Sequence, residues 1–154
     1  MPATQSSTVR RTVRPGLTLR RRLNAAPAKV YAAWLEPEKI AGWFGPSQVI
    51  TGSVQADVEP RTGGRYRIGF RTEDGQRHEV GGIYREMVPN QRLVFSWAWH
   101  TTPERESLVT ITLKPDGEGT LLTLDHEQFF DQAARDAHEG GWHGTLDKLE
   151  QFFS

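Results

Sequence analysis

Five histidines are the side chains that could move a proton near neutral pH: His78, His100, His126, His138 and His143. His126 alternates with Leu122 and Leu124 in a strand-like pattern, so we expect its ring to face the interior. There it would act as a general base, hydrogen-bond a ligand, or serve a structural role. Asp125 and Glu127, its neighbours in sequence, would point to the opposite face. Because a catalytic histidine needs an orienting acid, the structural role is favoured.

The sequence contains none of the common catalytic or metal-binding motifs. There is no H-E-x-x-H, no phosphate-binding loop, no dinucleotide fingerprint and no G-x-S-x-G. Zero cysteines exclude disulfides, thiolate nucleophiles and cysteine metal sites. His138 and His143 are five residues apart, which turns them about 140° from each other on a helix and away from a shared metal. We therefore expect no catalytic residue, no metal and no cofactor.

Composition narrows the class of protein further. The 154 residues suit one domain, and 36% hydrophobic with 25% charged residues is typical of a folded protein. Basic and acidic residues number 19 each, so no net field favours nucleic acid or an anionic membrane. No apolar run approaches the ~20 residues of a membrane-spanning helix. By elimination, and without a secretory signal, we expect a cytoplasmic protein.

The charge is unevenly distributed at the N-terminus. Residues 1–22 contain six arginines and no acid. Such a segment is either a transit peptide or nucleic-acid arm, or a mobile tail leading into a strand with basic outer positions. The second interpretation is favoured, because the arginines are dispersed. We predict a flexible tail over residues 1–15 and a single domain over residues 16–154.

Hydrophobic periodicity predicts an α+β fold. A first strand (17–24) precedes two short helices, which begin at Pro27 and Pro37. Period-two alternation then runs from residue 47 to 128 and indicates six antiparallel strands, the first of them at 47–58. A long helix (131–153) follows, in which Gly140-Gly141 marks a kink, a close approach or a helix boundary. The order predicts a curved antiparallel sheet wrapped around the C-terminal helix.

Several segments, in this order, resemble the helix-grip (START-like, SRPBCC) superfamily that also includes birch-pollen-allergen-like proteins. The chain is most similar to the branch named after the activator of the heat-shock-protein-90 ATPase. The segments are APAKVYAAW (26–34), WFGP (43–46), DVEPRTGGRY (57–66), GIYREMVPNQRL (82–93), TLLTLDH (120–126) and HEGGWHGTLDKL (138–149). The spacing of the arginine within EPR (59–61) departs from the usual form. The resemblance covers about residues 16–154.

The resemblance implies a cavity between sheet and C-terminal helix that accepts a hydrophobic or amphipathic small molecule. Strand parity turns several aromatic side chains to one side, where they either line such a cavity or fill an ordinary core. Trp43-Phe44 and Gly140-Gly141 form a plausible entrance. The candidate cavity residues are Trp34, Trp43, Phe44, Tyr66, Ile68, Phe70, Phe95, Trp97, Trp99, Leu122, Leu124, His126, Trp142 and Leu146.

Three functions fit these expectations. The first is non-enzymatic binding of a small hydrophobic or amphipathic molecule, with no nucleic acid and no membrane span involved. The second is an aromatase/cyclase-like enzyme in which His126 or Tyr66 assists proton transfer. The third, implied only by the name of the branch, is an interaction module for a chaperone ATPase. The sequence predicts neither the ligand nor the oligomeric state.

Overall fold

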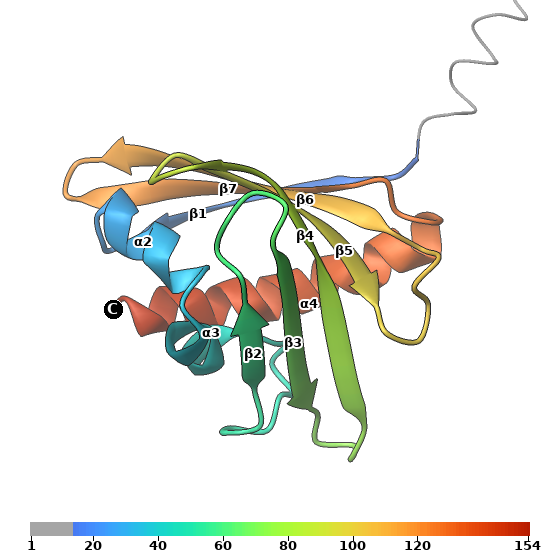
Figure 1. The fold of residues 1–154 in the computed structure, drawn as a ribbon. Helices are drawn as coiled ribbons and strands as arrows, with labels where there is room; N and C mark the ends of the chain where they lie inside the picture. The colour runs from blue at the N-terminus through green and yellow to red at the C-terminus, as the bar shows by residue number, and fades with distance from the viewer. Residues whose placement is uncertain (1–13) are drawn as a thin grey trace, which may run out of the picture.

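Residues 14–154 are described by the structure, a computed structural model, and they form a curved sheet packed on a long helix (Figure 1). The predicted tail thus lies almost entirely outside the described residues. The elements are β1 (Leu17–Leu23), α2 (Pro27–Ala33), α3 (Pro37–Trp43), β2 (Gln55–Val58), β3 (Arg65–Arg71), β4 (Arg77–Val88), β5 (Arg92–Trp99), β6 (Ser107–Asp116), β7 (Gly119–Glu127) and α4 (Gln132–Phe152). The predicted helix-grip arrangement is confirmed.

The seven strands form one antiparallel sheet in the order β1-β7-β6-β5-β4-β3-β2. Strands β2 to β7 follow one another as a meander, and β1 crosses over to pair with β7. The strands approach closely in the middle of the sheet: a Cβ added at Gly82 of β4 would lie 2.0 Å from the carbonyl oxygen of Ser96 on β5. Glycine at this position permits the close approach of the two backbones.

The expected strand over residues 47–58 is wrong in its first half. Only Gln55–Val58 forms a strand, and Val49 contributes a single bridge to Thr72. Gly45 and Gly52 adopt φ values of 99° and 86°, which L side chains rarely adopt. These glycines turn the chain, so the alternation of residue types in this segment belongs to a loop.

The two short helices form a unit beside α4. Pro27 and Pro37 stand at the helix starts, where a missing N–H removes no helical hydrogen bond. The indole of Trp43 donates a hydrogen bond to the carbonyl of Ala33 (3.1 Å) and so connects α3 to the end of α2. The Lys148 ammonium of α4 donates to the carbonyl of Phe44, the residue that ends α3 (3.0 Å). These contacts fix the beginning of the loop that follows α3.

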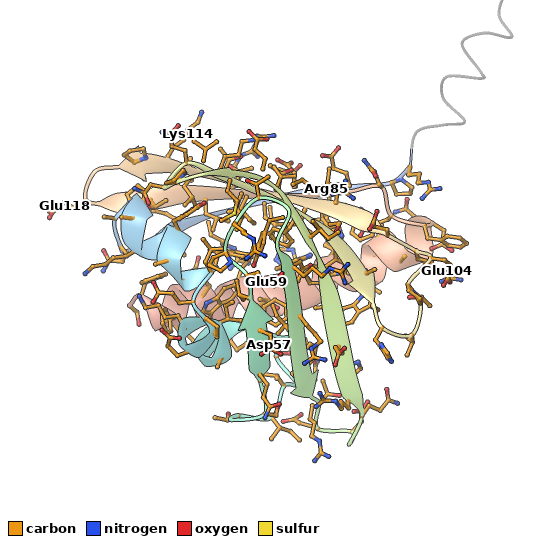
Figure 2. All side chains as sticks on the ribbon, in the orientation of Figure 1. Asp57, Glu59, Arg85, Glu104, Lys114 and Glu118 are labelled. Atoms are coloured by element: carbon orange, nitrogen blue, oxygen red, sulfur yellow. The ribbon has the colours of Figure 1, made fainter. Side chains whose placement is uncertain are left out.

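Helix α4 passes through Gly140-Gly141 without a break. Asp131 caps its N-terminus by accepting from the backbone N–H of Ala134 (2.8 Å). Of the three interpretations of the glycine pair, a helix boundary is therefore excluded. Figure 1 shows α4 lying along one face of the sheet, and Figure 2 places the charged Arg85 and Lys114 on the side away from it. Over residues 14–154, no helix is long and apolar enough to cross a membrane.

Candidate functional site

The candidate site is a cleft of about 950 Å³ between the sheet and the first half of α4. Its walls come from five parts of the chain. These are residues 44–48 after α3, residues 70–74 at the end of β3 and in the following turn, His78 of β4, Trp97 and Trp99 of β5, and residues 137–145 of α4. The volume lies in the range of small-molecule pockets, which is roughly 300–1,000 Å³. The cleft opens to solvent beside exposed Ala137 and Gly140.

Aromatic rings form the apolar wall of this cleft. The ring centroids of Trp97 and Trp142 lie 5.1 Å apart, and those of Trp97 and Trp99 lie 5.6 Å apart. Phe44 and Phe70 continue the wall, with centroids 6.0 Å from each other. These separations are typical of tilted and edge-to-face aromatic pairs. The wall is therefore a packed surface whose rings hold one another in place.

A second, enclosed space of about 20 Å³ lies deeper in the molecule, large enough for about one water. Phe44 and Trp97 belong to the walls of both spaces, so they separate the enclosed space from the cleft. Trp34 lines the enclosed space and is 6% exposed, and its indole N–H has no hydrogen-bond partner. Tyr31, the other such case among residues 14–154, has a buried hydroxyl without a partner.

His126 occupies the interior and uses both ring nitrogens. The indole of Trp142 donates to Nδ1 (2.9 Å), and Nε2 lies 2.7 Å from Oγ of Ser107. Because an indole N–H only donates, Nδ1 must accept, and the proton of the neutral ring sits on Nε2. Ser107 in turn donates to the carbonyl of Trp97 (3.3 Å). Burial, followed by the nearby His138, lowers the pKa of His126 well below its ordinary value.

His138 lines the cleft and links two tryptophans of the wall to α4. Its Nε2 accepts from the indoles of Trp99 (2.8 Å) and Trp97 (3.3 Å). Its Nδ1 therefore carries the proton and donates to the carbonyl of Ala134 (2.7 Å). Burial lowers the pKa of His138. This neutral ring fixes the orientation of both indoles.

A polar chain lies at the outer end of the cleft. Thr72 donates its hydroxyl proton to the carboxylate of Asp74 (2.6 Å), and its oxygen lies 3.0 Å from Nε2 of His78. The hydroxyl hydrogen bond, together with the backbone N–H of Gln76, lowers the pKa of Asp74. The His78 ring also stacks on Phe70, with centroids 5.2 Å apart. The polar chain and the aromatic wall thus meet at His78.

Across residues 14–154 there is no group of three or more His, Cys, Asp or Glu side chains that could hold a metal ion.

The model of the family described as "Activator of Hsp90 ATPase homolog 1-like protein" matches residues 24–154. The chain belongs to this family. The resemblance stated from the sequence segments is thereby confirmed. A search among curated proteins finds no match.

Solved structures with AHSA1-like folds agree with this assignment. Protein CV1439 from Chromobacterium violaceum is 29% identical (TM-score 0.79), with 90% of this chain and 97% of that chain covered. The AHSA1 protein from Silicibacter pomeroyi is 30% identical (TM-score 0.77), with 89% and 96% covered. CalU16 from Micromonospora echinospora is 27% identical (TM-score 0.66), with 90% and 76% covered.

Within the AHSA1-like fold, the fourteen candidate cavity residues fall into three groups. The cleft is lined by Phe44, Phe70, Trp97, Trp99 and Trp142. The enclosed space is lined by Trp34, Trp43, Tyr66, Ile68 and Phe95, and also by Phe44 and Trp97. The packed interior contains Leu122, Leu124, His126 and Leu146, which are 0% exposed and line neither space. In place of the expected single cavity, the structure has an open cleft and a small void. The remaining candidate residues are packed in the core and line neither space.

The expected entrance is only partly reproduced by the structure. Phe44, Gly140 and Gly141 do line the cleft, whereas Trp43 is 1% exposed and lies inside. The sequence interpretation also missed His138 and the polar chain of Thr72, Asp74 and His78 as parts of the wall. His78 had a usable signal, since it alternates with the buried Val80. His138 also had a signal, because it lies four residues after Ala134 and four before Trp142 and therefore shares a helix face with both.

A third space, a hollow of about 770 Å³, lies over strands β2 to β5. Charged side chains such as Arg65, Arg67 and Glu79 border it, and the backbone of Gly81 and Gly82 forms part of its floor. Without an aromatic cluster, it resembles an open sheet surface more than a binding pocket. The cleft against α4 is the better candidate.

Proposed function

We propose that this AHSA1-like protein binds a small hydrophobic or amphipathic molecule in the cleft between the sheet and the first half of α4. The observation that carries the proposal is the open volume of about 950 Å³ beside a continuous wall of aromatic rings. Burying such a surface against an apolar ligand gains roughly 25 cal/mol per Å². The rings are already held by one another and by His138, so binding orders few side chains.

The enzymatic alternative has less support from the same geometry. Both nitrogens of His126 are used inside the core, so His126 offers no free base to a molecule in the cleft. The Tyr66 hydroxyl donates to the carbonyl of Ser96 (2.7 Å), and burial raises its pKa well above the ordinary value. Neither group is placed to exchange a proton with a molecule in the cleft. The chaperone alternative draws its support from the family description alone.

A titration followed through the indole N–H signals tests the proposal. Lipids and aromatic metabolites should shift the signals of Trp97, Trp99 and Trp142, which line the cleft, and leave that of buried Trp43 nearly unchanged. Trp99→Ala should weaken binding because it removes part of the wall. Phe130→Ala is the control, since Phe130 is 52% exposed and lies outside the cleft.

The proposal fails if the tested ligands leave the indole signals in place. It also fails if shifts are confined to the outward-facing arginines Arg65, Arg67 and Arg71, which are exposed on β3. Equal weakening by Trp99→Ala and Phe130→Ala would likewise count against the cleft as the binding site.

A further inference from the structure

The hydrogen-bond donors of the cleft wall are largely used within the wall. The indole N–H of Trp142 goes to His126, and those of Trp97 and Trp99 go to His138. The remaining proton of His138 goes to a backbone carbonyl. Three tryptophans thus present ring faces and edges to the cleft and no free N–H.

The hydroxyl groups of the cleft follow the same rule. Thr145 donates to the carbonyl of Gly141 (2.9 Å), and Thr72 donates to Asp74. Because the single proton of Thr72 is committed to Asp74, the contact between Thr72 and His78 requires His78 to donate through Nε2. Nδ1 of a neutral His78 ring is then an acceptor. The polar groups of the cleft that remain free to bind a ligand are therefore mostly hydrogen-bond acceptors.

Among the described residues, the carboxylates that line the cleft have no lysine or arginine beside them in its lining. Glu73 and Asp74 both line it, and within residues 14–154 no lysine or arginine belongs to its lining. Lys148 is nearby, but its ammonium donates to the carbonyl of Phe44 and is not part of the wall. Only Ser47 and Gln48 offer lining side chains with donors that the described contacts leave free.

We propose that the cleft selects a cationic hydrogen-bond donor with an aromatic or otherwise apolar body, that is, an arylalkylamine-like ligand. The apolar body would lie against Trp97, Trp99 and Phe70, and the ammonium group would face Glu73 and Asp74. Charge-assisted hydrogen bonds to carboxylates and the attraction of a cation to an aromatic face both favour such a ligand. A carboxylate or phosphate ligand would instead meet two carboxylates without a lining cation to balance them. This inference rests on the proposed binding function.

Three probes with the same ring system separate charge from apolar contact: 2-(1-naphthyl)ethylamine, 1-naphthaleneethanol and 1-naphthaleneacetate. At neutral pH and low salt, the amine should bind about tenfold more tightly than the acid, with the alcohol between them. That ratio corresponds to about 1.4 kcal/mol, within the reach of two exposed charge pairs. Added salt should narrow the difference, since both carboxylates are exposed.

The double variant Glu73→Gln/Asp74→Asn should remove most of the preference for the amine and leave the affinity for the alcohol within about twofold. Asparagine can still accept the hydrogen bonds that Asp74 receives from Thr72 and Gln76, so the turn is preserved. Glu118→Gln is the matched control, because Glu118 lies in the β6–β7 turn, away from the cleft.

The outcomes distinguish the two proposals. If the alcohol binds but the acid binds as tightly as the amine, the charge inference is overturned and the binding function stands. The same holds if the amine is preferred but the double variant keeps the preference. If none of the three probes binds, the arylalkylamine inference is overturned, and the binding function is then decided by the lipid titration described under the proposed function.

Discussion

Replacing His126 by leucine removes the central residue of the buried hydrogen-bond network with Ser107 and Trp142 and puts an apolar side chain in its place. Trp142 then keeps a buried indole N–H without an acceptor, which costs about 1–3 kcal/mol. The lost bond to Ser107 adds about 0.5–1.5 kcal/mol, reduced because Ser107 retains its bond to the Trp97 carbonyl. We expect a loss of about 2–4 kcal/mol, a large share of the 5–15 kcal/mol typical of a domain.

The same variant should change how stability depends on pH. The pKa values of His126 and His138 are lowered in the folded protein, chiefly by burial, whereas an unfolded histidine titrates near pH 6.5. Below about pH 6.5 the unfolded chain therefore binds protons that the folded chain does not. Each of the two histidines then lowers the free energy of unfolding by up to about 1.4 kcal/mol per pH unit as the pH falls. His126→Leu should remove one of these two contributions.

Guanidinium unfolding at intervals from about pH 7.5 down to about pH 5.5 measures both effects and stays above the main titration of the carboxylates. His126→Gln, which offers an acceptor and a donor but does not titrate, should lose less stability and show the same reduced slope. His100→Gln is the control, because His100 is exposed, and it should stay within about 0.5 kcal/mol of the parent. A loss below about 0.5 kcal/mol for His126→Leu, with the slope unchanged, would refute the buried neutral network.

Two further predictions concern the glycines of helix α4 and its half-buried lysine. Gly140→Ala should raise the free energy of unfolding by about 1 kcal/mol, because an added Cβ meets nothing within 4 Å. Gly144→Ala should lower it by about 1–3 kcal/mol, because its Cβ would lie 2.9 Å from the backbone N of Ser47. Thermal unfolding compares the two variants, and equal effects would contradict the packing described. Burial lowers the pKa of Lys148 to about 8, so the unfolded chain holds its proton longer and stability should rise as the pH increases from about 8 toward 10. An NMR titration of methylated lysines, with Lys148→Met to assign the signal, would contradict this if the value is near the ordinary 10.4.

Most of the fold could be predicted because the strands carry their own signals. Period-two alternation predicted six strands between residues 47 and 128, and strands β2 to β7 all lie within that range. The error at residues 47–58 has a local cause, since the positive φ values of Gly45 and Gly52 cannot be inferred from alternation. The structure shows that only Gln55–Val58 of this segment forms a strand.

The site was harder to predict because its geometry depends on pairings between distant segments. Parity correctly placed His126 inside, but its partners Ser107 and Trp142 lie 19 and 16 residues away. The register between β6 and β7 and the rotation of α4 against the sheet together decide whether these groups meet. The same dependence explains why His138 was missed: its role exists only where β5 and α4 face each other.

The position of the cleft follows from the sizes of side chains on the two facing elements. In the direction of α3, Trp34, Trp43 and Phe95 fill the space under the sheet and leave about 20 Å³. In the other direction, α4 contributes Ala137, Gly140 and Gly141 to the cleft opposite the aromatic wall. These residues have little or no side chain to fill the space. The glycine pair thus lowers helix propensity and also keeps the cleft wide. On this view, Gly140→Ala should stabilise the protein and at the same time reduce the room for a ligand.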